Sequence, residues 1–210
     1  MAVRTVRCSG ASVLATAALV LAALLGTPFS PSPAGAATPQ WETTATYTPL
    51  VNVRAVSCAP GSTTCVAVGD DGGHFASIIV SDDGGVTWTD ATPPPGVTSL
   101  STVSCPSAAI CYAGGGSGIL KSTDGGVTWA VQDSGFPAQS ISCSAAATCM
   151  AAGGTAVMST SDGLTWISDS TPVGLDSLVD ISCVTSVDCV GVGSLDSTPS
   201  ILATQDGSKW

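Results

Sequence analysis

The sequence predicts an all-β fold built from about four repeats, and three observations support this prediction. Five tryptophans recur 37 to 47 residues apart, at positions 41, 88, 129, 166 and 210. Four close pairs of cysteines recur with nearly the same period. Within each repeat, apolar and polar residues alternate over short segments, as in half-buried strands. Four short strands repeated about every 40 residues are typical of a β-propeller, in which each repeat forms one blade.

The second repeat shows the expected elements in order. TSLSTVSC (98–105), CYAGGG (111–116), GILKST (118–123) and TWAVQ (128–132) each have the length and alternation of a strand, and Gly or Pro separates them. No segment after residue 37 has a helical period. We therefore expect an all-β propeller of about four four-stranded blades over residues 38–210. Its repeat units are about 41–87, 88–128, 129–165 and 166–210.

Residues 1–37 have the features of a secretory signal peptide. Arg4 and Arg7 form a basic start, residues 11–26 form an apolar run, and Ala36 and Ala37 suit cleavage. A membrane anchor is the alternative interpretation, but the apolar run is shorter than the roughly 20 residues that a span requires. We therefore expect a secreted, extracellular protein that does not associate with the membrane after cleavage.

The charge of the chain argues against two classes of partner. The net charge is −10, and all 15 acidic residues lie after residue 37 together with only Arg54, Lys121 and Lys209 as bases. Such a surface repels phosphate backbones and anionic lipids, so nucleic acids and membranes are poor partners. The Ala-, Gly-, Val- and Thr-rich composition suggests a GC-rich bacterial gene.

The cysteines predict disulfides within single repeats. Cys8 leaves with the signal peptide, and eight cysteines remain. Their regular spacing indicates the local pairs Cys58–Cys65, Cys105–Cys111, Cys143–Cys149 and Cys183–Cys189. Such pairs close in the oxidising environment that an exported chain meets. Zinc is the alternative, but zinc sites usually place cysteines two to four residues apart and often add histidine, whereas His74 is the only histidine here.

A short acidic turn precedes four of the tryptophans. SDDGGVTW (81–88) and STDGGVTW (122–129) share Ser, Asp, Gly, Thr and Trp at one spacing. In STSDGLTW (159–166) and ATQDGSKW (203–210) the aspartate lies one place later. The turns resemble the Asp-box, or BNR, repeat Ser-x-Asp-x-Gly-x-Thr-Trp of sialidase-like propellers. The layout is also similar to propellers of the photosystem-assembly-factor type.

The resemblance implies that these turns join the third and fourth strands of each blade. Aspartate accepts N–H bonds within a turn, glycine adopts positive φ, and tryptophan buries a large area between blades. We therefore expect structural roles, with no catalytic residue, metal or cofactor. The assigned residues are Ser81, Asp83, Gly85, Thr87 and Trp88; Ser122, Asp124, Gly126, Thr128 and Trp129; Ser159, Asp162, Gly163, Thr165 and Trp166; and Asp206, Gly207 and Trp210.

Sialidase activity is excluded by the residues that the resemblance would require. Sialidases bind their sugar with three arginines, and Arg54 is the only one after residue 37. Other glycosidases need two carboxylates about 5 to 10 Å apart. The candidates outside the turns are Asp70, Asp71, Asp90, Asp133, Asp169, Asp176, Asp180, Asp188 and Asp196. The densest polar cluster, residues 70–74, is interpreted as an acidic turn, with a catalytic or calcium-binding role as the alternative.

The sequence thus predicts a secreted, non-catalytic module that binds an extracellular glycan or protein, and we expect it to be monomeric. Tyr112 or Phe136 could stack on a sugar if exposed. The alternative is part of a glycoside hydrolase or lyase whose remaining catalytic residues lie beyond residue 210. The chain ends at Trp210, within a motif. Either an N-terminal strand containing Trp41 completes a four-bladed ring, or further blades follow; five tryptophans against four cysteine pairs favour further blades.

Overall fold

The computed structural model describes residues 52–72, 75–207 and 209–210. All of them belong to one compact unit, Glu42–Trp210. The predicted signal peptide, the strand at Trp41 and His74 lie outside the described residues. Within these residues the structure contains fifteen strands and no helix, so the predicted all-β fold is confirmed.

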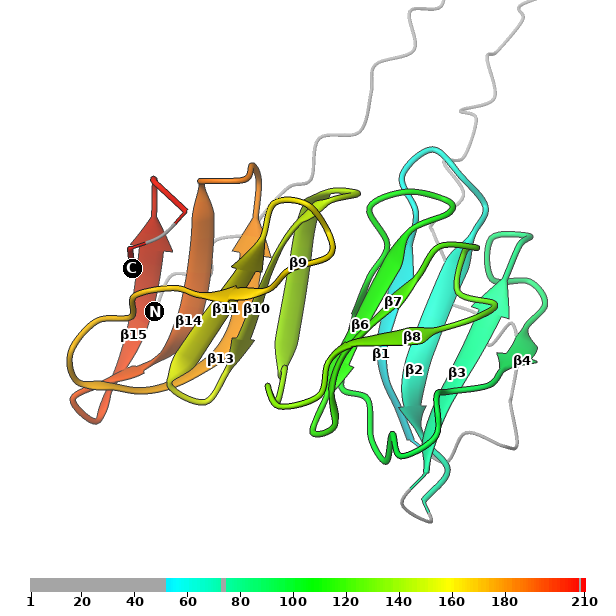
Figure 1. Ribbon diagram of the computed structural model, residues 1–210, viewed down its shortest axis with the longest axis horizontal. Coiled ribbons are helices and arrows are strands. Elements are labelled where there is room, and N and C mark those ends of the chain that lie inside the picture. Colours follow the sequence, from blue (N-terminus) through cyan, green and yellow to red (C-terminus); the bar gives the residue numbers. More distant parts are fainter. Residues whose placement is uncertain (1–51, 73–74, 208) are drawn as a thin grey trace, which may run out of the picture. The chain divides into compact units, whose positions relative to one another are not determined.

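The strands form four antiparallel sheets, three with four strands and one with three (Figure 1). Each strand pairs with its sequence neighbour. Sheet 1 contains β1 (Asn52–Cys58), β2 (Cys65–Asp70), β3 (Ala76–Ser81) and β4 (Thr89–Ala91). Sheet 2 contains β5 (Thr102–Ser104), β6 (Cys111–Gly115), β7 (Gly118–Ser122) and β8 (Ala130–Asp133). Sheet 3 contains β9 (Ser140–Ala145), β10 (Thr148–Gly153), β11 (Ala156–Thr160) and β12 (Ile167–Ser168), and sheet 4 contains β13 (Leu175–Cys183), β14 (Cys189–Leu195) and β15 (Thr198–Thr204).

Each complete sheet spans the boundary between two of the sequence units. Each acidic turn and its tryptophan connect two paired strands: the strand before the turn pairs with the strand after the tryptophan. Thus β3 pairs with β4, and β7 pairs with β8. The tryptophan therefore begins the outer strand of one blade, and the next blade begins only after the following Pro- and Gly-containing loop.

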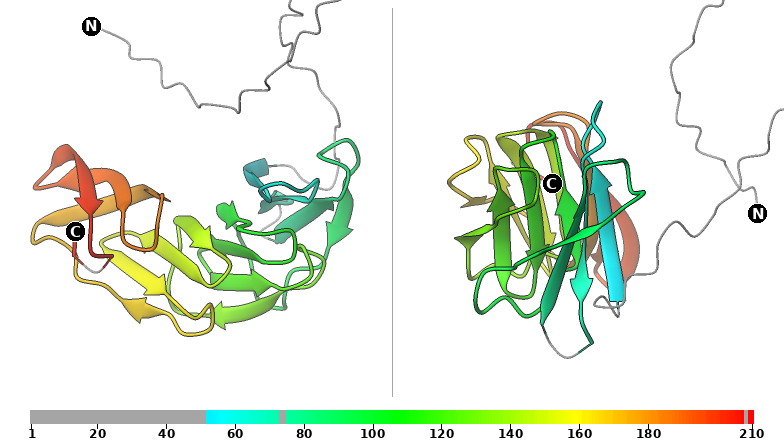
Figure 2. Two further views of the ribbon diagram at one scale, coloured as in Figure 1. Left: turned by 90° about the horizontal axis from the view of Figure 1, so that it is seen from above. Right: turned by 90° about the vertical axis from the view of Figure 1, so that its right-hand side faces the viewer.

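Successive sheets are joined through their first strands. Contacts link β1 to β5, β5 to β9 and β9 to β13, and Figure 2 shows the sheets following one another in sequence order. A serine in each of the first three of these strands accepts a hydrogen bond from a cysteine N–H of the next repeat. The bonds join Ser57 Oγ to Cys105 N (3.0 Å), Ser104 Oγ to Cys143 N (3.2 Å) and Ser142 Oγ to Cys183 N (2.9 Å). The repeated Ser-Cys dipeptide therefore connects one blade to the next.

The hydrophobic core lies between neighbouring sheets. Sheets 1 and 2 share a cluster around Val66, Ile78, Leu100 and Leu120. Similar clusters fill the space between sheets 2 and 3, around Tyr112 and Ile141, and between sheets 3 and 4, around Met150 and Leu178. Many of the other core residues are alanines, so each blade buries little apolar volume and relies on additional constraints.

The structure contains the four expected disulfides. They join Cys58 to Cys65, Cys105 to Cys111, Cys143 to Cys149 and Cys183 to Cys189. Each bond connects the end of the first strand of a sheet to the start of its second strand. The bonds therefore reinforce short β-turns within single blades and do not join one blade to another.

Candidate functional site

The acidic turns that end in tryptophan, hereafter the Trp turns, are held together by their own side chains. In the first turn, Asp83 accepts hydrogen bonds from the Ser81 hydroxyl (2.8 Å) and the Thr87 hydroxyl (2.6 Å). Asp124 has the same partners in the second turn, Ser122 and Thr128. In these two turns the indole N–H of the tryptophan donates to a glycine carbonyl, from Trp88 to Gly85 and from Trp129 to Gly126.

The third and fourth Trp turns are one residue shorter than the first two. The structure places Thr160, and not Ser159, at the start of the third turn, where its hydroxyl donates to Asp162 (3.1 Å). Ser159 instead donates to Asp169 (3.0 Å). Thr204 has the corresponding position in the fourth turn and donates to Asp206 (3.2 Å). Alignment on Ser/Thr-x-Asp, rather than on the tryptophan, would have identified both threonines.

The shorter turns leave two indole groups without an acceptor. The buried Nε1 atoms of Trp166 and Trp210 have no hydrogen-bond partner among the described residues. In the first two turns the acceptor is the carbonyl of the glycine three residues before the tryptophan. The shorter turns also have this glycine, Gly163 and Gly207, whose N–H groups donate to the Thr160 and Thr204 hydroxyls. The carbonyl of Gly163 instead accepts a hydrogen bond from Lys121 of sheet 2 (2.7 Å).

Hydrogen bonding stabilises the charged form of three aspartates of the Trp turns, Asp83, Asp124 and Asp162. The hydroxyl and N–H of Thr87 lower the pKa of Asp83 to about 2. The N–H groups of Thr165 and Leu164 lower the pKa of Asp162 to about 2, and Thr128 lowers the pKa of Asp124. A carboxylate with so low a pKa is a poor general acid near neutral pH, which favours a structural role for these residues.

These low pKa values predict a specific loss of stability in acid. The Asp83 carboxyl loses its proton at a lower pH in the folded state than in the unfolded state. Its contribution to the free energy of unfolding is therefore fully present above the unfolded pKa of about 4 and is lost as pH falls towards the folded pKa of about 2. Between about pH 2 and about pH 4, D83N should take up fewer protons on unfolding than the wild type, by up to about one proton. Urea unfolding at several pH values would measure this change. D82N is the matched control, and an equal effect of both substitutions would contradict the prediction.

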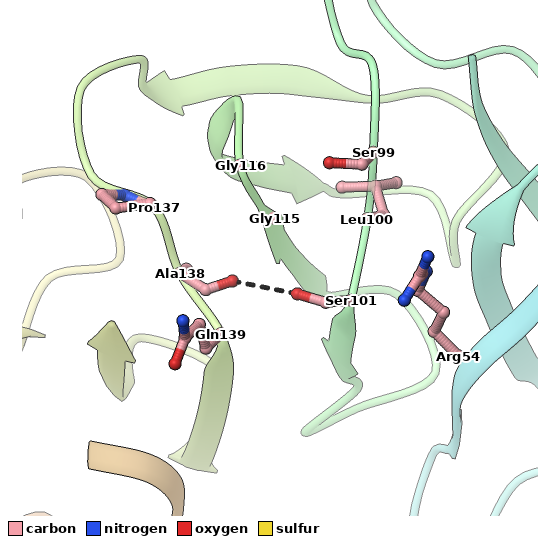
Figure 3. A pocket seen from close by; sticks show the side chains of 9 residues that line it. All are labelled: Arg54, Ser99, Leu100, Ser101, Gly115, Gly116, Pro137, Ala138 and Gln139. Carbon is pink, nitrogen blue, oxygen red and sulfur yellow. Dashed lines mark hydrogen bonds between the residues drawn. The ribbon is translucent and has the colours of Figure 1, made fainter. Parts of the chain in front are cut away.

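A pocket of about 280 Å³ lies where sheets 1, 2 and 3 meet (Figure 3). Arg54 of β1 lies on one side, and Pro137 and Gln139 lie on the opposite side. The other lining residues are Ser99, Leu100, Ser101, Gly115, Gly116 and Ala138. The Ser101 hydroxyl donates to the Ala138 carbonyl (3.2 Å) across the pocket floor. The exposed polar groups are therefore one guanidinium, hydroxyls, an amide and backbone.

Arg54 is held in this pocket by Asp70. Its Nε donates to Asp70 Oδ2 (2.8 Å), while Asn52 Nδ2 donates to Oδ1 (2.8 Å). These hydrogen bonds, from Asn52 first and Arg54 second, lower the pKa of Asp70. The Arg54 side chain is still 51% exposed, whereas that of Asp70 is 11% exposed. A second hollow of about 260 Å³ shares Arg54 and Ser99 with the first, so the cation can be reached from two sides.

No motif in the sequence predicts this pocket. Arg54 is a single arginine where a sialidase needs three, and Ser99, Ser101 and Gln139 belong to no recognisable motif. The lining residues come from three different repeats: Arg54 from strand β1, Ser99–Ser101 and Gly115–Gly116 from the second repeat, and Pro137–Gln139 from the loop before β9. The unusual feature in the sequence was that Arg54 is one of very few bases in an acidic chain.

Neither candidate for sugar stacking is available. Tyr112 is fully buried, and its hydroxyl donates to the Ala146 carbonyl (2.9 Å). Its ring packs edge-on against Trp166, with the centroids 6.1 Å apart, and burial raises its pKa. Phe136 is only 8% exposed. Both rings belong to the core between sheets 2 and 3, so neither offers a flat surface for a sugar.

Most of the aspartates outside the Trp turns accept hydrogen bonds from neighbouring strands or turns. Asp133 accepts the Gly135 and Phe136 N–H groups, and Asp188 accepts the Thr185 hydroxyl. Asp71 accepts the N–H of Phe75, Asp176 that of Ser197, and Asp180 the hydroxyl of Ser140. Among the described residues, no group of three or more His, Cys, Asp or Glu could hold a metal ion.

Asp169 differs from these aspartates, because its environment favours the protonated form of its carboxyl. It lines a hollow of about 330 Å³ between sheets 3 and 4, which Asp206 also lines. Burial raises the pKa of Asp169, and its Oδ2 has no hydrogen-bond partner among the described residues. Asp206, however, accepts bonds from Thr204 and from the N–H of Lys209 within its own turn. The hollow therefore offers a candidate acid without a free second carboxylate.

No family model matches the sequence, and no curated protein matches it. Solved propeller structures are similar. YCF48 bound to D1 peptide has a TM-score of 0.50 at 13% identity, over 74% of this chain and 64% of that protein. The GH74 enzyme of Niastella koreensis has a TM-score of 0.54 at 15% identity, over 72% of this chain and 30% of that enzyme.

The similarity concerns the fold alone, since both identities are low. This chain spans less than two thirds of either protein. One of the two proteins is a peptide-bound protein and the other is an enzyme, so the fold does not distinguish binding from catalysis. No helix in the described part of the chain is long and apolar enough to cross a membrane. The four antiparallel sheets and the similar structures show that this protein is a β-propeller of about four blades.

Proposed function

We propose that this chain is a secreted, non-catalytic Asp-box propeller that binds an extracellular protein partner through the Arg54 pocket. The observation that carries the proposal is the composition of the pocket. The half-exposed Arg54 side chain lies beside hydroxyl, amide and backbone groups, and the residues that line the pocket include neither a carboxylate nor an aromatic ring. Such a lining suits recognition by hydrogen bonds and does not supply an acid–base pair.

The chemistry of the pocket favours a protein segment that carries a carboxylate. Guanidinium groups bind carboxylates through paired, charge-assisted hydrogen bonds. Asp70 holds the Nε side of Arg54, and the half-exposed side chain leaves donors for a partner. In a chain of net charge −10, Arg54 is one of few groups that attract an anion. A glycan is less favoured because the pocket lacks an exposed ring on which a sugar could stack.

Secretion is the second part of the proposal. The signal-peptide features of residues 1–37 support it, as do four disulfides, which persist mainly in oxidising compartments. The turns Ser81–Trp88 and Ser122–Trp129 support membership of the Asp-box group, because their serine, aspartate and threonine bond to one another within each turn.

Selection from a random peptide display library on the full secreted protein tests the binding role. We expect acidic peptides to be enriched, and R54A to weaken their binding by about 10- to 100-fold, since hydrogen bonds to charged groups contribute about 1.5–3 kcal/mol. Q139A should also weaken binding without disturbing Asp70. K209A is the matched control because it removes one positive charge from the fourth Trp turn.

Two results would contradict this proposal. Peptide binding that R54A and Q139A leave unchanged would place the binding site elsewhere. Binding of a glycan array that depends on the same two residues would make the partner a carbohydrate.

A hydrolase or lyase with further catalytic residues beyond residue 210 is the second candidate function. The raised pKa of Asp169 in its hollow favours it, because burial shifts a carboxyl towards the protonated form, as in general acids. Release of reducing sugar from polysaccharides by the wild-type protein, abolished in D169N but not in D133N, would establish this activity. Absence of turnover would leave the binding role.

A further inference from the structure

A separate hollow of about 230 Å³ lies where the second and third Trp turns meet. Thr128 and Trp129 of the second turn line it, and so does Leu164 of the third. Lys121 of β7 and Gln132 of β8 are its longest polar side chains. Sheets 2 and 3, which supply these residues, each have a described sheet on both sides. The hollow therefore belongs to the interior of the array of blades.

The cation and the amide of this hollow are not required by the fold of a blade. In the first repeat the places of Lys121 and Gln132 are taken by Val80 and Ala91. The outer strands of the two blades nevertheless pair in the same way, β3 with β4 and β7 with β8. The two polar residues are therefore a property of this site and not of the repeat.

Lys121 has no ion pair, and it keeps capacity to bind a ligand. Its Nζ donates to the Gly163 carbonyl (2.7 Å) and lies 5.5 Å from the centre of the Tyr112 ring. An ammonium group has three N–H donors, so at least one donor is left over. In the described part of the chain the one ion pair joins Arg54 to Asp70. The residues that line the hollow include no carboxylate, so an anionic ligand would meet a cation there.

Two further polar side chains of the hollow are free. Among the described residues, neither the Gln132 amide nor the Thr123 hydroxyl has a hydrogen-bond partner. An amide and a hydroxyl each provide both donors and acceptors. The hollow therefore offers donors and acceptors beside one cation, which suits a ligand that carries hydroxyl groups and an anionic group.

Trp129 and Leu164 supply the apolar part of the lining. Trp129 packs partly against the core between sheets 1 and 2 and also lines the hollow, while Leu164 is 67% exposed. An indole provides a flat apolar surface, which matches the C–H face of a sugar ring. Pockets for drug-sized ligands are larger, about 300–1,000 Å³, so this hollow suits a single sugar unit.

We propose that this hollow binds an acidic sugar, a hexuronate unit of a polysaccharide. The C–H face of the sugar stacks on Trp129, and its carboxylate accepts a hydrogen bond from Lys121. Its hydroxyl groups bond to Gln132 and Thr123. The inference is independent of the protein partner proposed for the Arg54 pocket, because the two sites share no lining residue.

Calorimetric titration of the full secreted protein with oligosaccharides of glucuronate, galacturonate and mannuronate tests this inference. The methyl ester of each oligosaccharide is the matched ligand, because it lacks only the negative charges. We expect at least one acidic form to bind more tightly than its ester. K121A should weaken binding of that form by about 10- to 100-fold, as expected for a hydrogen bond between charged groups, and should remove its advantage over the ester.

Q132A tests the site with little risk to the fold. It gives the second blade the residue that the first blade has at the same place, Ala91. It should weaken binding of the acidic form and of its ester alike, by about 2- to 10-fold, because a neutral hydrogen bond is lost from both. Circular dichroism checks the folding of K121A, since Lys121 also bonds to Gly163; if K121A is unfolded, Q132A and the ester comparison decide.

R54A and Q139A are the matched controls, because they remove one positive charge and one amide from the other pocket. Both should leave oligosaccharide binding unchanged, and K121A and Q132A should leave binding of acidic peptides unchanged. The failure of one proposal is therefore distinguishable from the failure of the other.

Four results would overturn the proposal. The first is binding of every acidic oligosaccharide with a Kd weaker than about 1 mM, or about 4 kcal/mol. The second is equal affinity for the acidic forms and their esters. The third is oligosaccharide binding that folded K121A and Q132A leave unchanged. The fourth is binding of an acidic peptide that depends on Lys121 and Gln132 but not on Arg54, which would make the ligand of this hollow a protein.

Discussion

Reduction of the four disulfides should unfold the propeller at room temperature. Each bond closes a loop with a sequence separation of six or seven residues. On the chain-entropy model, a loop of this size stabilises the folded state by about 2.5 kcal/mol. Four such bonds together contribute about 10 kcal/mol, which is similar to the whole stability of a typical domain, about 5–15 kcal/mol. The alanine-rich interfaces between the sheets bury little apolar volume, so they provide little further stabilisation.

Far-UV circular dichroism of the secreted protein with and without a reductant measures this effect. The oxidised protein should melt cooperatively, and the reduced protein should show no transition because it is already unfolded. C143A/C149A removes one bond and should lose only about 2.5 kcal/mol in urea unfolding. A reduced protein that melts within about 3 °C of the oxidised one, a shift that corresponds to about 1 kcal/mol for a chain of this length, would show that sheet packing alone supports the fold.

G118A should destabilise the protein more than any other single methyl addition at a turn glycine. Gly118 begins β7 with a φ of +117°, and an added Cβ would lie 1.9 Å from the Asp133 carbonyl oxygen. The obstacle is the backbone of the neighbouring strand β8, which cannot rotate away as a side chain can. Backbone strain and overpacking together should lower the free energy of unfolding by at least about 3 kcal/mol.

G154A is the matched control for G118A. Gly154 also has a positive φ, +60°, but no atom lies within 4 Å of the position of its Cβ. Alanine there should cost only about 1 kcal/mol, the usual penalty for a left-handed conformation. Urea unfolding of both variants compares the two costs directly. Equal destabilisation would show that the β7–β8 pair can separate enough to accept a methyl group.

The features predicted correctly from the sequence are those that neighbouring residues determine. Each disulfide joins cysteines six or seven residues apart, and each sheet pairs consecutive strands. The order of strands therefore followed from alternation and turn residues alone. The hydrogen bond of Ser57 to the next blade could not be predicted in this way, because its partner, the N–H of Cys105, lies in the next repeat.

Side-chain competition within a turn was harder to predict. Both Ser159 and Thr160 could have bonded to the aspartate of the third Trp turn. Alternation along β11 places adjacent side chains on opposite faces, so Thr160 bonds to Asp162 and Ser159 to Asp169. In this shorter turn the Gly163 carbonyl accepts a hydrogen bond from Lys121, and the indole N–H of Trp166 has no partner among the described residues. Sequence spacing alone did not show on which face each hydroxyl would lie.

The sequence by itself determined the all-β class, the repeat, the local disulfides and the acidity of the surface, because these depend on contacts between near neighbours or on composition. Only the tertiary structure decided that Tyr112 is buried, that Arg54 and Gln139 line one pocket, and that Lys121 and Trp129 line another. These properties depend on how separate blades pack together. Residues that are equivalent in the repeat have different environments because each blade has different neighbours.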